Sequence, residues 1–156
     1  ICDDGRQEVE TVAAIARQVE RRLRRAGAQV EVLDEYDPRL NGYLADAVVS
    51  LHADSCIERS GFKVARWQES AMPEVEDRLV RCLSDSYAAA TGLPFDADTI
   101  TDDMTLYHAF RKLAVATPAA IVETGFLGGD WELIGRRPNV AADGVVDGLV
   151  CFFAAP

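Results

Sequence analysis

Residues 45–52 read ADAVVSLH, a compact apolar run that stops abruptly at polar side chains. A short run that is apolar at nearly every position is typical of a strand buried on both faces of a parallel sheet. A second run, AAIVE at residues 119–123, ends in the same way and is followed by polar and glycine-rich residues. These two runs indicate a sheet covered by helices.

Three long segments have the periodicity of amphipathic helices. In residues 8–26 the apolar side chains recur at spacings of three and four, which places them on one helix face. Gly27 follows and supplies a common helix stop. The same reasoning predicts helices at residues 73–90 and 138–153 and a short helix at residues 130–134.

Two more segments are expected to be strands. Residues 29–33 (QVEVL) alternate between polar and apolar side chains, and residues 61–67 (GFKVARW) form a further β-type run. Residues 36–43 contain proline, asparagine and glycine, which predicts a loop or a short helix. The alternation of strands and helices predicts a single α/β domain over residues 1–156, with a mostly parallel twisted sheet and helices on both faces.

The bulk composition limits the class of protein. A chain of 156 residues fits one domain, and 49% hydrophobic residues with a mean hydropathy of -0.03 are typical of a globular protein. No apolar run approaches the roughly 20 residues that a membrane span needs. The net charge of -10 argues against a nucleic-acid-binding surface, and we interpret the arginines within residues 17–25 as a solvated helix face.

The four cysteines are widely separated and form no CxxC pair, which excludes a zinc ribbon and a thioredoxin-type motif. One or two disulfides in an exported protein agree with the sequence. Free buried thiols agree with it equally, because two of the cysteines lie in apolar helical patterns. The cysteines are Cys2, Cys56, Cys82 and Cys151.

Each of the two apolar runs ends in a residue of catalytic type, His52 in one and Glu123 in the other. Ligand sites of open α/β sheets collect beyond the carboxyl ends of the strands, so these side chains could form a metal-plus-base site. A histidine at a strand end can also be a hydrogen-bonded structural residue. A carboxylate that closes a buried strand is costly unless it is paired or functional.

These residues also lie in two longer motifs. Residues 50–54 (SLHAD) resemble the S-[IL]-H-A-[ND] motif of the zinc-dependent N-acetylmuramoyl-L-alanine amidases of the amidase-3 type. Residues 118–127 (PAAIVETGFL) are similar to the P-A-[VI]-[LI]-x-E-x-G-F-[LIM] motif of that family. An acidic residue at the start of the helix at residues 8–26 fits as well, so the resemblance covers nearly the whole chain.

The resemblance implies a role for each matching position. Glu8 would be a carboxylate zinc ligand, with Glu10 as the second choice, and His52 would be an imidazole ligand. Glu123 would be the general base that activates a zinc-bound water. The implied cofactor is Zn²⁺ alone. The implied substrate is peptidoglycan, cleaved at the amide between N-acetylmuramic acid and L-alanine, which places the protein outside the cytoplasmic membrane.

One ligand of the family pattern has no counterpart. The first ligand of the family is a histidine in a Gly-His segment on the opening strand, and the sequence from Ile1 to Glu8 contains no histidine. We therefore expect the first strand and one ligand to be missing. The alternative is that His108, the only other imidazole, completes the site. Two other functions stay open: a zinc peptidase or deacylase acting on another amide, and a catalytically inactive amidase-like module that binds cell-wall material.

Other side chains have weaker claims to a role in the site. Asp54 could orient His52 through its other ring nitrogen. Tyr107, His108 and Arg111 could line a substrate groove or simply face solvent. Three glycines, Gly125, Gly128 and Gly129, resemble a loop of close backbone approach, and Trp67 and Trp131 are expected to be packing residues rather than sugar platforms.

Overall fold

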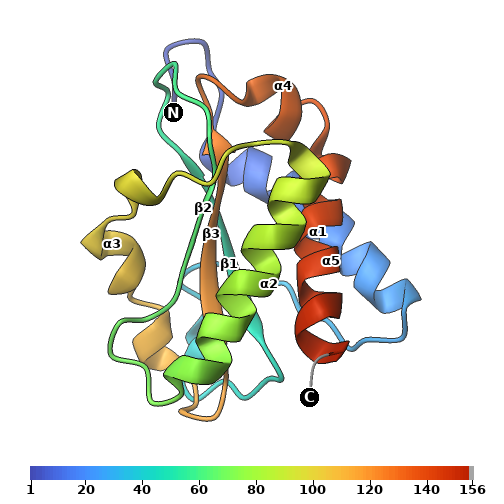
Figure 1. The fold of residues 1–156 in the computed structure, drawn as a ribbon, viewed down its shortest axis with the longest axis vertical. Helices are drawn as coiled ribbons and strands as arrows, with labels where there is room; N and C mark the ends of the chain where they lie inside the picture. Colours follow the sequence, from blue (N-terminus) through green and yellow to red (C-terminus); the bar gives the residue numbers. More distant parts are fainter. Residues whose placement is uncertain (155–156) are drawn as a thin grey trace.

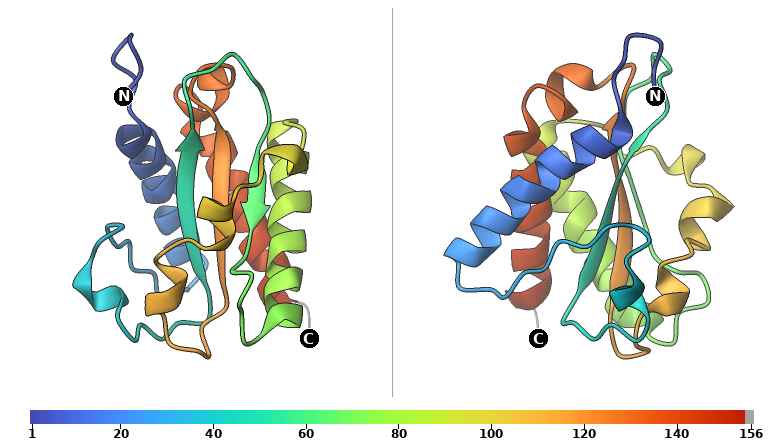
Figure 2. Two further views of the ribbon diagram at one scale, coloured as in Figure 1. Left: turned by 90° about the vertical axis from the view of Figure 1, so that its left-hand side faces the viewer. Right: turned by 180° about the vertical axis from the view of Figure 1, so that it is seen from behind.

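The computed structural model describes residues 1–154, which form a small sheet with helices on both sides (Figure 1). Three long helices lie on one face of the sheet, and the other face is covered by short helices and loops (Figure 2). The α/β class is therefore confirmed. The long helices are α1 (Glu8–Arg25), α2 (Pro73–Thr91) and α5 (Pro138–Ala154). The short ones are α3 (Asp102–Thr105), α4 (Trp131–Ile134) and the 3-10 turns η1 (Pro38–Leu40), η2 (Ala97–Thr99) and η3 (Phe110–Lys112).

The sheet is mixed: one of its two strand pairings is parallel and the other, shorter one is antiparallel. Its strands are β1 (Val48–Asp54), β2 (Lys63–Ala65) and β3 (Ala119–Phe126), in the order β1-β3-β2. The central strand β3 pairs with β1 in parallel and with β2 antiparallel. The connection at residues 55–62 explains this result, because a crossover that returns a strand in the parallel direction needs about a dozen or more residues.

The prediction of a strand at residues 29–33 is wrong, since this segment is an irregular loop. A strand needs a neighbour that satisfies its backbone hydrogen bonds, and within residues 1–154 none of the three strands pairs with it. Its alternation buries little, as Val32 is 51% exposed. The other predicted elements are present, and residues 36–43 hold the short turn η1.

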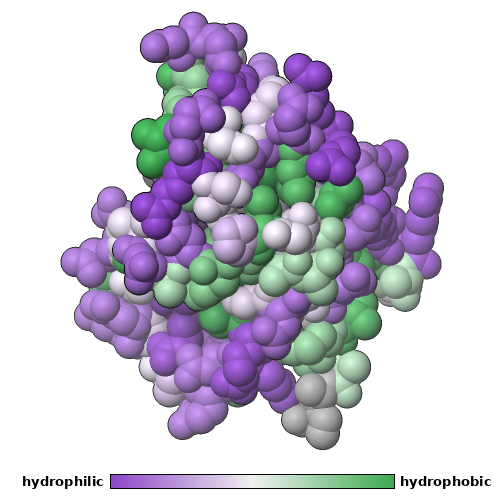
Figure 3. Space-filling view, turned by 45° about the horizontal axis from the view of Figure 1, so that its top comes forward, coloured by the Kyte–Doolittle hydropathy of each residue, from purple (hydrophilic) through white to green (hydrophobic). Residues whose placement is uncertain are grey.

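The main core lies between the sheet and the long helices. Fully buried side chains come from every layer: Ile15 from α1, Tyr87 from α2 and Val122 from β3. Trp67 and Trp131 pack against the two apolar clusters, as expected for packing residues. Hydrophilic residues surround the apolar ones on the face in Figure 3, in agreement with the net charge of -10. No helix in residues 1–154 is long and apolar enough to cross a membrane.

All four cysteines are in disulfides, so the alternative of free thiols is wrong. Cys82 and Cys151 join α2 to α5, and these two helices share an extensive interface. Cys2 and Cys56 join the segment before α1 to the connection that follows β1. The Cys2–Cys56 bridge therefore fixes the start of α1 next to the carboxyl end of β1.

The loop after β3 packs closely against the connection at residues 55–62, and two glycines allow this approach. A Cβ atom on Gly128 would lie 2.1 Å from the carbonyl oxygen of Ile57, and one on Gly129 would lie 1.9 Å from that of Arg59. Both distances are far below van der Waals contact, so only glycine allows the backbones to approach this closely. The expectation of a close backbone approach is thus met at these two positions.

We expect Gly129→Ala to destabilise the protein by about 2 kcal/mol or more, because the added methyl group forces two backbone segments apart. Urea unfolding followed by circular dichroism measures this change. Gly27→Ala is the control, because a Cβ at Gly27 meets no atom within 4 Å, although its positive φ of 93° adds some strain. Equal destabilisation by the two substitutions would contradict the role of close approach at Gly129.

Candidate functional site

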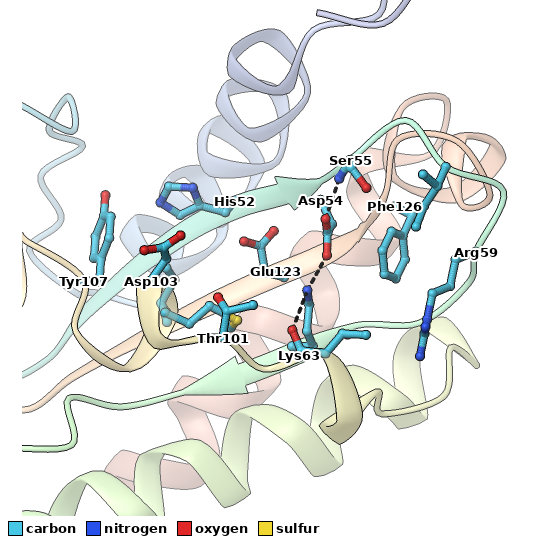
Figure 4. Close-up of a pocket in the computed structure, with 14 residues that line it drawn as sticks. His52, Asp54, Ser55, Arg59, Lys63, Thr101, Asp103, Tyr107, Glu123 and Phe126 are labelled. Atoms are coloured by element: carbon cyan, nitrogen blue, oxygen red, sulfur yellow. Dashed lines mark hydrogen bonds and ion pairs between the residues drawn. The ribbon is translucent and has the colours of Figure 1, made fainter.

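Three of the predicted site residues come together near the carboxyl ends of β1 and β3. In the parallel pairing of these strands, His52 lies opposite Glu123, so that their side chains share one face of the sheet. Figure 4 shows the two side chains next to each other, on the side where Tyr107 and Asp103 also lie. Glu8, the first residue of α1, reaches the same place from the helix. The structure therefore brings Glu8, His52 and Glu123 into one site.

Glu8 and His52 are in direct contact. The Nδ1 atom of His52 lies 2.9 Å from Oε1 of Glu8, and the backbone N–H of Ala53 donates to the same oxygen at 3.3 Å. Burial opposes the charged imidazole, but the hydrogen bond to Glu8 and the charges of Glu123 and Glu8 outweigh it and raise the pKa of His52. The same hydrogen bond lowers the pKa of Glu8. The two groups thus stabilise each other as an ion pair.

Glu123 is the most perturbed carboxyl group of the site. Burial raises its pKa to about 7, and the positive charges of His52 and Lys63 offset only part of this effect. Its Oε2 atom is buried and has no hydrogen-bond partner. A buried polar atom without a partner is costly, and such groups concentrate at functional sites. Glu123 therefore has the environment of a group that exchanges a proton near neutral pH.

Sequence reasoning missed Lys63, which is only 3% exposed and lies opposite Glu123 on β2. Its ammonium group pairs with the carboxylate of Asp54, donates to the carbonyl oxygen of Thr99 at 3.3 Å and lies 5.3 Å from the ring centre of Phe126. The signal was present in the sequence, because a single lysine interrupts the apolar part of GFKVARW. A buried lysine needs such a partner to stay charged.

The pairing of Lys63 explains why Asp54 does not orient His52. The carboxylate of Asp54 accepts hydrogen bonds from Lys63 and from the backbone N–H of Ser55. Burial raises the pKa of Asp54, but the hydrogen bonds from Lys63 and Ser55 and the charge of Lys63 together outweigh this effect, so the net change is a decrease. The register between β1 and β3 shifts between His52 and Asp54. Glu8, rather than Asp54, holds the imidazole of His52.

His52, Lys63 and Glu123 line an open cleft of about 440 Å³ on this face of the sheet (Figure 4). The far wall comes from the segment around α3. Thr101 is the residue before this helix, and it lines the cleft although its hydroxyl group makes no capping hydrogen bond. Other side chains of the lining are Asp54, Ser55, Arg59, Asp103, Met104, Tyr107 and Phe126.

His108 does not join the site. Its Nε2 atom lies 3.0 Å from Oε1 of Glu35, and its ring stacks on Tyr36. The ring of Tyr107 contacts both imidazoles and separates His108 from His52. Within residues 1–154, no group of three or more His, Cys, Asp or Glu residues is arranged to hold a metal ion. His108 as a third ligand therefore has no support in the geometry.

Two further candidates, Glu10 and Arg111, lie outside the cleft. Glu10, the second choice for the acidic ligand, is exposed on α1, whereas Glu8 contacts His52. Arg111 donates a hydrogen bond to the carbonyl oxygen of Leu106 at 3.2 Å and is exposed. Of Tyr107, His108 and Arg111, the residues expected to line a groove or face solvent, only Tyr107 lines the cleft.

The raised pKa of Glu123 predicts that the metal-free protein loses stability as the pH rises. Between about 4.5, the ordinary value, and about 7, the folded state holds a proton that the unfolded state has released. The free energy of unfolding should therefore fall across this window, by up to roughly 3 kcal/mol. Unfolding in urea at a series of pH values measures the effect.

The matched control is Glu123→Gln, which keeps the shape of the side chain but cannot titrate. The stability of wild type relative to this variant should decrease from pH 4 to pH 8. Parallel stability curves for the two proteins would contradict the proposed environment of Glu123.

No protein-family model and no curated protein sequence matches the chain. Several solved structures do match its fold. The N-acetylmuramyl-L-alanine amidase Ami1 from Mycobacterium smegmatis has a TM-score of 0.76 and 21% identity, over 99% of this chain and 80% of that one. The catalytic domain of CwlV, an N-acetylmuramoyl-L-alanine amidase from Bacillus (Paenibacillus) polymyxa var. colistinus, has a TM-score of 0.69 and 20% identity, over 97% and 88% of the two chains.

The amidase AmiC2 of Nostoc punctiforme is similar in the same way, with a TM-score of 0.66 and 20% identity over 95% of this chain and 85% of that one. TM-scores of 0.66 to 0.76 establish a shared fold, and at identities near 20% function has to be argued from the site itself. The chain therefore has the fold of the N-acetylmuramoyl-L-alanine amidases, as the resemblance of its two motifs predicted.

Proposed function

We propose that the protein is a zinc-dependent hydrolase that cleaves the amide between N-acetylmuramic acid and L-alanine in peptidoglycan. The observation that supports this most directly is the convergence of three side chains: His52 and Glu123 lie opposite each other in the lining of an open cleft, and Glu8 contacts His52. The three residues occupy the positions that the two motifs and the first helix imply. The similar solved structures are amidases of this specificity by name.

Glu8 and His52 are the proposed zinc ligands. A carboxylate and an imidazole are both common ligand types for zinc, and catalytic zinc sites usually combine three protein ligands with an open position. The side chains of Glu8 and His52 already meet at 2.9 Å, and no third His, Cys, Asp or Glu within residues 1–154 completes the set. Zinc, when bound, polarises the scissile carbonyl group and lowers the pKa of a water molecule.

Glu123 is the proposed general base. In the metal-free protein burial raises the pKa of this carboxyl group to about 7, so that it is present in both protonation states near neutral pH. It can accept a proton from the attacking water and return it to the departing amine, because one of its oxygens has no other partner. Asp54, the neighbouring carboxylate of the cleft, is already paired with Lys63.

The proposed location is outside the cytoplasmic membrane. Peptidoglycan is found there, and the two disulfides support this location because such bridges persist in oxidising compartments. The acidic surface implied by the net charge of -10 offers no general attraction for polyanions. The substrate must then be recognised by local contacts in and around the cleft.

We expect Glu123→Gln to lower the rate of muropeptide hydrolysis by about 100-fold or more, because the base is lost. The assay supplies zinc and follows the peptide released from a purified muropeptide by chromatography. Glu10→Gln makes the same chemical change at an exposed position and should leave the rate unchanged.

Three outcomes separate the alternatives. Cleavage of plain peptides as fast as muropeptides would assign a peptidase instead. Binding of muropeptide with no release of peptide by the wild-type protein would assign an inactive binding module. Full activity of Glu123→Gln would contradict the role of Glu123.

A further inference from the structure

A continuous run of aromatic rings leads from His52 to the protein surface, and its outer part has no role in the hydrolysis proposed above. The ring of Tyr107 lies 5.1 Å from His52 and 4.6 Å from His108. His108 in turn stacks on Tyr36, with ring centres 5.0 Å apart and an angle of 5° between the planes. We call Tyr36, Tyr107 and His108 the aromatic ledge.

The ledge is held in a defined position although its outer ring faces solvent. Tyr36 is 73% exposed. Behind it, His108 is fixed by the contact between its Nε2 atom and Glu35 at 3.0 Å. Tyr107 is buried at the base, and burial together with the nearby Glu35 raises the pKa of its hydroxyl group. An exposed aromatic ring that is already ordered loses little entropy on binding, which favours its use as a contact surface.

The chemistry of the ledge fits a sugar ring. A pyranose has flat C–H faces that pack on an aromatic ring and an edge of hydroxyl and amide groups that need hydrogen-bond partners. The ledge combines the exposed ring of Tyr36 with two polar groups: the carboxylate of Glu35, which contacts His108, and the ammonium of Lys112, which lies over the ring of Tyr36 at 5.7 Å from its centre.

The overall negative charge of the protein opposes a nucleic acid as the ligand. A nucleic-acid base would bring a phosphate backbone to a protein of net charge -10 and to the carboxylate of Glu35. A neutral sugar polymer carries no such penalty. The position is suitable as well, because Tyr107 belongs both to the ledge and to the lining of the cleft.

We infer that the aromatic ledge binds an N-acetylated amino-sugar ring of the glycan strand while the scissile amide lies at His52 and Glu123. This inference rests on the proposed function for its choice of glycan. It adds the sugar backbone of the substrate to the groups that the protein recognises, and it assigns a role to Tyr36.

The test uses a peptide-free glycan, tri-N-acetylchitotriose, which the proposed reaction cannot cleave. Titration of the whole chain, followed by NMR of the tyrosine and histidine ring signals, should show saturable binding. Tyr36→Ala should weaken this binding about fivefold or more, because one stacking surface is lost. Tyr36→Trp should retain it, since a larger flat ring takes the same place.

Phe153→Ala is the matched control, because Phe153 is an aromatic side chain of α5 that is 55% exposed and packs on Phe152, away from the ledge. It should bind the glycan like wild type. Absence of saturable binding by wild type, or unchanged binding by Tyr36→Ala, would overturn the inference. Glycan binding that depends on Tyr36 in a protein without amidase activity would retain the ledge and refute the proposed function instead.

Discussion

The parallel pairing of β1 with β3 is the constraint on which the site depends. This register places His52 opposite Glu123, and a shift by one residue would turn one of the two side chains to the other face of the sheet. The disulfide between Cys2 and Cys56 and the close approach of Gly128 and Gly129 then hold the surrounding loops against the ends of these strands. The Cys2–Cys56 disulfide lies just before α1, so it holds Glu8, the first residue of this helix, within reach of His52.

The site concentrates charge in a place where charge is expensive. Lys63 and Asp54 neutralise each other, and so do Glu8 with His52, whereas Glu123 has an oxygen without any partner. Pairing makes the first two arrangements tolerable in a partly buried cleft. The unpaired carboxylate costs stability, and in an enzyme this cost is offset by the proton transfer that a perturbed pKa permits.

Local patterns in the sequence were sufficient for the long helices, for the two apolar strands and for His52 and Glu123 at the ends of these strands, whereas Glu8 was singled out only by the resemblance to the amidase family. Contacts between distant segments were not readable in this way. The alternation at residues 29–33 could not show that no strand pairs with it, and the pairing of Lys63 with Asp54 depends on the antiparallel placement of β2 beside β3, which no local pattern reveals. The disulfides were left open for the same reason, because pairing follows from the fold rather than from the spacing of cysteines.

Zinc titration of the chain, followed by NMR of its two imidazoles, tests most directly the proposal that Glu8 and His52 form a metal-binding pair. His108 acts as the internal reference, because it lies outside the cleft. The account predicts that zinc shifts the ring signals of His52 but not those of His108, and that Glu8→Gln weakens this response about tenfold or more. Equal responses of both imidazoles, or none at His52, would contradict it.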